Sequence, residues 1–118
     1  MNYSRPTLRK NTIEQIKASA QKNSEGKYIS PYTGKVIPEK DGKQVYDIGH
    51  KQGHEHWREA KKAEEEGLSR EEFIERMNDP NKYQIEDRSE NRSRKYEIPA
   101  QEQSENIQEQ EEEIESSM

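Results

Sequence analysis

Short apolar runs punctuated by turn signals occupy residues 27–48. Pro31-Tyr32-Thr33-Gly34 combines a proline that presets φ with a glycine that allows positive φ, and Asp41-Gly42 is a second hairpin signal. The strand candidates around these turns are residues 27–29, 35–37 and 44–48. We therefore expect a small β-meander that leads directly into His50.

Helical patterns lie on both sides of this meander. Thr12 followed by Gln15 has the spacing of a capping box and predicts an N-terminal helix of about two turns. Residues 53–66 predict a second helix that ends at Gly67, and Trp57 is expected to anchor its buried face.

The next segment predicts a third helix and a final strand. Ser69 and Glu72 form a second capping box, and Asn78-Asp79-Pro80 ends the helix that this box begins. A strand at residues 83–85 and a helical turn at residues 91–96 follow. The order of these elements predicts an α+β fold with an inserted pair of helices.

The scarcity of apolar residues limits the chain to one small domain. Only 25% of the 118 residues are hydrophobic, against 38% charged, so we expect a single core within residues 1–97. The absence of cysteine excludes disulfides and thiolate zinc sites. We expect neither a signal peptide nor a membrane segment, because no apolar run approaches the ~20 residues that a span needs.

Charge is divided unevenly along the chain. Residues 98–118 contain seven Glu and neither Lys nor Arg, which leaves residues 1–97 with 18 acidic groups against all 20 basic ones. The Glu-, Gln- and Ser-rich composition of residues 98–118 predicts a disordered acidic tail, whereas the mildly basic body suits an anionic polymer as partner.

His50 is the first candidate for catalysis. It directly follows Gly49, which permits close approach of a ligand to the backbone, and Asp47 in the same strand can orient the ring or bind a cation. The stretch from residue 83 to residue 97 adds carboxylates, an amide and guanidinium groups. Phosphodiester cleavage needs this combination of a base, cations and oxygen ligands. A zinc site on His50, His54 and His56 is disfavoured, because no fourth ligand lies nearby.

The same stretches resemble the GH-E family of the HNH and endonuclease VII superfamily. The resemblance rests on residues 47–53, on Arg70-Glu71-Glu72-Phe73-Ile74, on the break at residues 78–80 with Tyr83, and on residues 89–97, and it extends over residues 5–97. It implies a ββα-metal (His-Me finger) nuclease of the kind found at the C-termini of bacterial polymorphic toxins, including LXG-type toxins. Such a domain would be secreted as part of a larger toxin, act in the target-cell cytoplasm, cut DNA or RNA, and be neutralised by a cognate immunity protein.

The resemblance also implies roles for individual residues. His50 matches the general base, Asn91 the residue that holds the catalytic loop, and Glu97 the closing glutamate. Asp47 is implied as a ligand of Mg²⁺ or Mn²⁺, with Glu86 as a second acidic candidate. The implied substrate-binding residues are Lys51, Arg92, Arg94 and Lys95.

Two departures from the family pattern leave the mechanism open. Arg94 stands where the family has a histidine, and Gln52 replaces a proline. Arginine is no metal ligand, so the cation is held by oxygens alone or the reaction needs no metal. The alternatives are metal-assisted attack of water, metal-independent attack of an RNA 2′-hydroxyl, and a non-catalytic binding module with an attenuated nuclease site.

Overall fold

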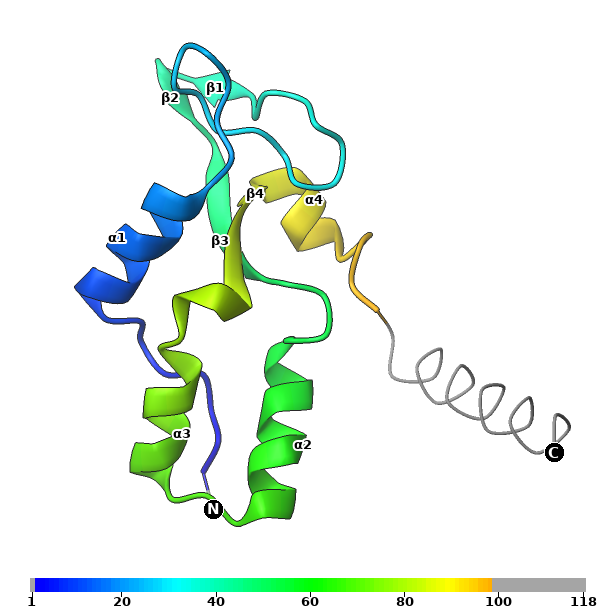
Figure 1. Cartoon of the computed structure of the whole chain (residues 1–118). Helices are drawn as coiled ribbons and strands as arrows, with labels where there is room; N and C mark the ends of the chain where they lie inside the picture. The colour runs from blue at the N-terminus through cyan, green and yellow to red at the C-terminus, as the bar shows by residue number, and fades with distance from the viewer. Residues whose placement is uncertain (1, 99–118) are drawn as a thin grey trace, which may run out of the picture.

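The computed structural model describes residues 2–98 as a small α+β fold, which confirms the predicted fold class (Figure 1). Its elements in chain order are α1 (Lys10–Ser19), β1 (Glu39–Lys40), β2 (Lys43–Gln44), β3 (Tyr46–His50), α2 (His56–Glu66), α3 (Arg70–Met77), the 3-10 helix η1 (Pro80–Lys82), β4 (Tyr83–Asp87) and α4 (Arg88–Ser93). The predicted acidic tail lies outside these residues, apart from Ile98.

A two-stranded antiparallel ribbon of β3 and β4 forms the centre of the fold. Its register pairs Asp47 with Glu86, Gly49 with Gln84, and His50 with Tyr83. Helix α1 covers one side of the ribbon and α4 the other (Figure 1). Strands β3 and β4 together with α4 therefore make the ββα unit that the sequence predicts, and the helices α2 and α3 are inserted between its strands.

The predicted meander is only partly formed. The hairpin at Asp41-Gly42 is confirmed, because β1 and β2 pair across it. The segments at residues 27–29 and 35–37 are joined by a single bridge between Ile29 and Val36, so their prediction as strands is wrong. The side chain of Gln44 adds to the backbone contacts of this segment, since its amide bonds both the N–H and the carbonyl of Tyr28 at 2.9 and 3.0 Å.

The predicted starts of three helices are also wrong. Helix α2 begins at His56 rather than Gly53, whose φ of 88° lies in the left-handed region. Helix α1 begins at Lys10 rather than after Thr12, whose hydroxyl bonds Asn78 at 3.1 Å from inside the helix. The Oδ1 atom of Asn78 also accepts from the backbone N–H of Arg9, the N-cap residue of α1, so a distant residue holds the start of this helix. Helix α4 begins at Arg88 rather than residue 91, because the Asp87 carboxylate accepts from the backbone N–H of Ser89 at 2.9 Å.

Two small apolar clusters stabilise the fold. One lies between α1 and the ribbon and comprises Ile16, Ile37, Tyr83 and Ile85, and the other lies between α2 and α3 and comprises Ala63, Phe73 and Met77. The left-handed Gly67 and the Ser69–Glu72 capping box between these helices are as predicted. The prediction that Trp57 anchors the core is wrong, because this half-buried residue lies outside both clusters.

Candidate active site

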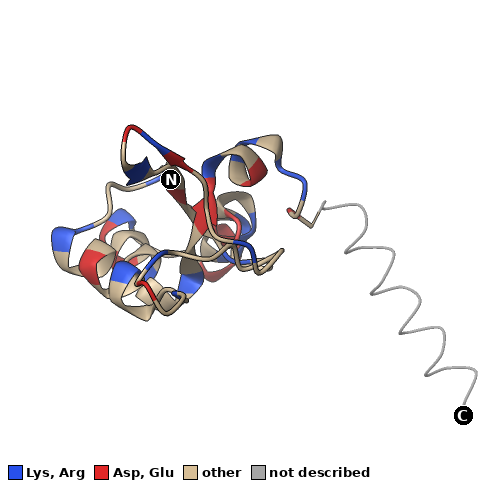
Figure 2. Cartoon of the chain, turned by 90° about the horizontal axis from the view of Figure 1, so that it is seen from above, with Lys and Arg blue, Asp and Glu red and all other residues tan. Residues whose placement is uncertain are grey.

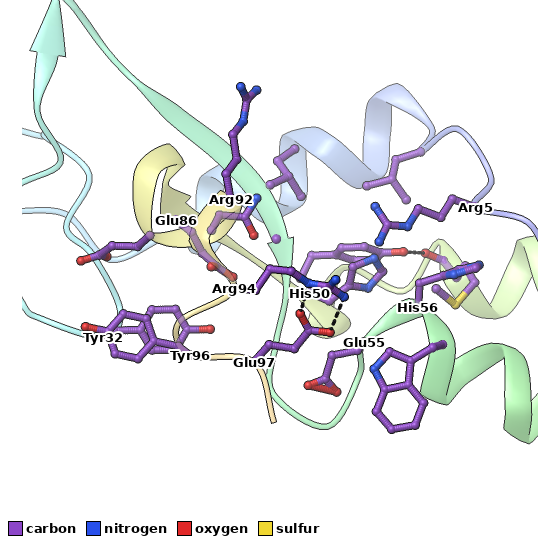
Figure 3. A pocket seen from close by; sticks show the side chains of 18 of the residues that line it. Arg5, Tyr32, His50, Glu55, His56, Glu86, Arg92, Arg94, Tyr96 and Glu97 are labelled. Carbon is purple, nitrogen blue, oxygen red and sulfur yellow. Dashed lines mark hydrogen bonds and ion pairs between the residues drawn. The ribbon is translucent and has the colours of Figure 1, made fainter. Parts of the chain in front are cut away.

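A cavity of about 560 Å³ opens beside the end of β3 (Figure 3). Its wall comes from seven parts of the chain: the segment before α1, the turn at Tyr32, the β3–β4 ribbon, the start of α2, the end of α3, α4, and the residues that follow α4. The polar residues in this wall include Arg5, Tyr32, His50, Glu55, His56, Tyr83, Glu86, Glu90, Asn91, Arg92, Arg94, Tyr96 and Glu97. The fold therefore brings together most of the predicted site residues, namely His50, Glu86, Asn91, Arg92, Arg94 and Glu97.

His50 is the last residue of β3 and is half-buried in this wall. Its ring packs against that of Tyr83, the residue opposite it in β4, with 4.7 Å between ring centroids. Burial lowers the pKa of His50, the positive charge of Arg5 lowers it further, and the nearby backbone of His54 offsets part of the decrease. The imidazole is therefore neutral at pH 7, the form that accepts a proton.

Gly49 allows a carboxylate to lie directly beside the backbone next to His50. Glu86 is 4% exposed, and a Cβ atom at position 49 would stand 2.3 Å from its Oε2 atom and 2.9 Å from Oδ1 of Asn91. Any side chain larger than hydrogen would displace these oxygens. Burial raises the pKa of Glu86, although hydrogen bonds from Gln84 and Tyr32 reduce the effect.

Asp47 fixes the orientation of the Asn91 amide. The Nδ2 group of Asn91 donates to Oδ2 of Asp47 at 3.1 Å, which leaves the amide oxygen facing Gly49 and Glu86. Asp47 also pairs with Arg88 at 2.9 Å and Arg92 at 3.2 Å. Burial alone would raise the pKa of Asp47, but these hydrogen bonds outweigh burial and lower it. Both Asp47 oxygens thus have partners in the protein, and its role as a metal ligand stays a prediction.

The predicted cationic residues divide into two groups. Arg92 and Arg94 line the cavity, and each is paired with a carboxylate there: Arg92 with Asp47, and Arg94 with Glu97 at 2.6 Å. The hydrogen bond from Arg94 lowers the pKa of Glu97, which also accepts from Trp57. Lys51 and Lys95 are exposed and lie outside the cavity wall.

The structure adds cavity residues that the sequence pattern did not single out. Arg5 reaches the wall from the segment before α1, which contains Arg5 and Arg9 and leads into Lys10, the first residue of α1. Glu55 is 6% exposed and pairs with Arg58 at 3.1 Å. Tyr32 and Tyr96 stack 4.1 Å apart with nearly parallel rings. No local sequence signal brings these last residues together, because their contacts depend on the tertiary fold.

A second Gly-His pair, Gly53-His54, follows the first by four residues but is used differently. Nδ1 of His54 bonds Oε1 of the buried Glu59 at 2.9 Å, and Lys82 pairs with the other Glu59 oxygen at 2.9 Å. This network ties the loop after β3 to α2 and η1. His54 is absent from the cavity wall, so the geometry distinguishes it from His50.

The donor set suits a hard divalent cation with few protein ligands. Within residues 2–98, no three His, Asp or Glu side chains gather as a metal-binding group. Glu86 and Asn91 nevertheless bring a carboxylate and an amide oxygen together beside Gly49. Mg²⁺ commonly binds through one or two carboxylates while water and substrate phosphate complete its shell, so these residues fit Mg²⁺ or Mn²⁺.

Basic and acidic residues are interspersed along the chain: Lys and Arg positions alternate with Asp and Glu along the helices and strands that Figure 2 draws. No helix of the described chain has the length and apolar content needed to cross a membrane.

A ββα unit with a neutral histidine at a strand end, beside a buried carboxylate and a half-buried amide, has the architecture of a small nuclease. The chain belongs to the GH-E family: residues 25–97, well over half of it, match this family, which is described as an HNH/ENDO VII superfamily nuclease with conserved GHE residues. The match confirms the resemblance over that range, and residues 5–24 lie outside it. No solved structure matches the chain.

Proposed function

We propose that this domain is an endonuclease in which His50 is the general base. One observation carries the proposal. In this member of a nuclease family, His50 has a lowered pKa and lines the same cavity as Glu86 and Asn91, whose side-chain oxygens lie beside the adjacent Gly49. His50 takes a proton from water as the water oxygen bonds to phosphorus and the bond to the leaving oxygen breaks.

The remaining residues would hold and orient the reacting groups. Glu86 and Asn91 would hold a divalent cation, which supplies charge stabilisation for the phosphoryl oxygens when bound. Asp47 would position the Asn91 amide, as their 3.1 Å hydrogen bond indicates. Arg92 and Arg94 lie on the same wall and would offset negative charge near the scissile group.

A metal-independent ribonuclease is the second candidate, and one departure from the family pattern supports it. By the resemblance described above, Arg94 stands where the family has a histidine, and arginine is no metal ligand. In this mechanism His50 deprotonates a ribose 2′-hydroxyl, and the guanidinium groups of Arg92 and Arg94 stabilise the phosphate. This reaction is closed to DNA, which lacks the hydroxyl.

The biological setting proposed for this activity follows from the family resemblance described above. The domain would be the toxic part of a larger secreted protein, would act on nucleic acid in the cytoplasm of a target bacterium, and would be neutralised by a cognate immunity protein. Co-expression in bacteria tests the setting: cells producing the chain should die, and the immunity protein encoded with it should restore growth.

A direct cleavage assay tests the activity. The purified chain is mixed with plasmid DNA and with total RNA, in Mg²⁺ or in EDTA, beside a His50→Ala variant. Cleavage by the parent and its loss in the variant support the proposal. Stable binding of nucleic acid without any cleavage, in every metal tested, would instead establish a binding module with an attenuated site.

A further inference from the structure

Arg5 is a cationic residue of the cavity wall without a carboxylate partner in the described part of the chain. Three arginines line the cavity, and two of them are paired with carboxylates: Arg92 with Asp47, which Arg88 shares, and Arg94 with Glu97. Arg5 makes neither a hydrogen bond nor an ion pair with any residue in the range 2–98. Its guanidinium is directed towards His50 in the close view of the cavity (Figure 3).

The backbone around Arg5 is held on both sides. Before it, the Tyr3 hydroxyl donates to the Leu68 carbonyl at 2.6 Å, and the Tyr3 carbonyl lies 2.6 Å from Nε2 of His56. After it, the backbone N–H of Arg9 donates to Asn78 at 2.9 Å. These contacts attach the segment to α2, to the α2–α3 turn and to the end of α3. An exposed side chain is thus carried on a fixed backbone, which lowers the entropy cost of using it to bind a ligand.

The charge of Arg5 acts at the reaction centre. Burial has the largest effect on the pKa of His50, and Arg5 is the next cause of its decrease. The other charged or titratable groups that act on His50 are Glu55 and His56 at the start of α2. Arg5 also interacts electrostatically with Tyr83 and Glu97 on the neighbouring walls. Its guanidinium therefore lies within electrostatic range of the groups that surround the proposed scissile phosphate.

We propose that Arg5 is a substrate-binding residue that holds a backbone phosphate of the nucleic acid beside His50. A guanidinium presents paired N–H donors that match two phosphate oxygens, and one without a carboxylate partner binds phosphate without first breaking an ion pair. Arg5 lies outside residues 25–97, so the segment before the family match completes the substrate site. The inference rests on the proposed nuclease function and extends it to this segment.

Binding measurements on uncut nucleic acid test the assignment. Full-length His50→Ala serves as the parent, so that affinity is measured without cleavage, with short single-stranded DNA and RNA and their duplexes as probes. Adding Arg5→Ala should weaken binding about 10- to 100-fold, the range for one hydrogen-bonded charged group. The slope of log affinity against log salt should decrease in magnitude by about 0.7 to 0.9, the change expected when one phosphate is no longer neutralised.

Two further variants show whether the effect belongs to the guanidinium. Lys10→Ala removes an exposed charge at the start of α1, five residues after Arg5 and outside the cavity wall, and should leave both affinity and salt slope unchanged. Arg5→Lys keeps the charge without the paired donors, so it should restore the salt slope but only part of the affinity.

Equal affinity of the parent and Arg5→Ala would overturn the assignment, as would an equal loss in Lys10→Ala. Cleavage by the chain with native His50 would then still support the proposed function. If the His50→Ala parent binds none of the probes and the native chain cleaves nothing, both proposals are wrong. Thermal unfolding of each variant checks the fold, which should be unaffected because the Arg5 side chain makes no bond within the described residues that stabilises it.

Discussion

The carboxylate of Glu86 occupies the space that a side chain at Gly49 would fill. A Cβ atom at position 49 would lie 2.3 Å from Oε2 of Glu86, well inside van der Waals contact. The two residues are diagonal neighbours on adjacent strands, because the register partner of Glu86 is Asp47, two residues before Gly49. The glycine therefore allows β4 to deliver an acidic oxygen to the backbone position next to the proposed base.

Replacing this glycine should damage the site more than the fold. In Gly49→Ala we expect the flexible end of Glu86 to move away, with Asn91 Oδ1 also displaced from its 2.9 Å approach. Cleavage should fall at least about 10-fold, in line with the loss of precise positioning, while unfolding remains cooperative. The double variant Gly49→Ala with Glu86→Ala relieves the overlap. The double variant should be more thermally stable than the sum of the two single-variant effects predicts. If the two effects simply add, Gly49 and Glu86 do not make the close contact described here.

Glu86→Gln should separate stability from activity. Burial raises the pKa of Glu86, so the folded state favours its protonated form. This contribution to stability is present below the unfolded-state pKa near 4.5 and is lost as the pH rises through the folded-state pKa. Glutamine mimics the neutral acid at every pH. The variant should therefore be inactive yet more stable than the parent at pH 7, with the difference vanishing below about pH 4.

Denaturant unfolding at several pH values measures this effect. A difference that is the same at all pH values would show that the substitution acts through packing rather than through the charge of Glu86. Glu90→Gln, a change of charge in α4 on the same cavity wall, serves as the comparison for stability only.

The pH dependence of cleavage should report His50. Its pKa is lowered from the ordinary value of 6.5 by burial and by Arg5, so the neutral base is available at a lower pH than usual. We expect the acid limb of kcat/KM to have its midpoint below 6.5. His50→Ala should reduce cleavage about 10²- to 10⁴-fold, the contribution typical of a general base.

The second Gly-His pair provides the matched control for His50. His54→Ala removes an imidazole that bonds Glu59 rather than one that lines the cavity. It should lower thermal stability while retaining cleavage and the same acid limb. Comparable losses of cleavage in the two variants would be inconsistent with His50 as the base.

Local signals predicted those parts of the fold that local contacts determine. Ser69 and Glu72 form their capping box across one turn, and Asp41-Gly42 forms its hairpin, so a short stretch of sequence holds the necessary information. Thr12 has the same kind of spacing, but its hydroxyl bonds Asn78, a residue 66 positions away. The start of α1 is therefore set by tertiary contact, which no local pattern reveals.

In the candidate site too, some features can be predicted from adjacent residues, whereas others depend on tertiary contacts. His50 was identified because glycine, histidine and strand end are adjacent in the sequence. Arg92 is paired with a carboxylate because the fold brings it to Asp47. Arg5 reaches the cavity because its segment contacts the α2–α3 turn and the end of α3. Pairing and proximity of this kind arise only once the chain has folded.

Chelation should distinguish the two proposed mechanisms. If Glu86 and Asn91 hold a divalent cation, EDTA should stop cleavage of DNA and RNA, and Mg²⁺ or Mn²⁺ should restore it. The metal should also raise the melting temperature of the parent, because a ligand that binds the folded state stabilises it, but not that of Glu86→Gln. Undiminished cleavage of RNA in EDTA, with DNA untouched, would establish the 2′-hydroxyl mechanism instead.

Restoring the family histidine should strengthen metal binding. Arg94 is exposed, with a left-handed backbone at φ 58° that ends α4, and its ion pair with Glu97 is a surface contact that contributes little to stability. Arg94→His would add an imidazole, a ligand for divalent transition metals, to the cavity wall near Glu86 and Asn91. We expect half-maximal activation at a Mn²⁺ concentration about 10-fold lower than in the parent, within the range typical of one altered ligand or ligand partner.

Arg94→Gln removes the same charge without adding a ligand, so its Mn²⁺ requirement should match that of the parent. An identical shift in the two variants would mean that the Arg94 charge, rather than the missing ligand, sets the affinity for metal.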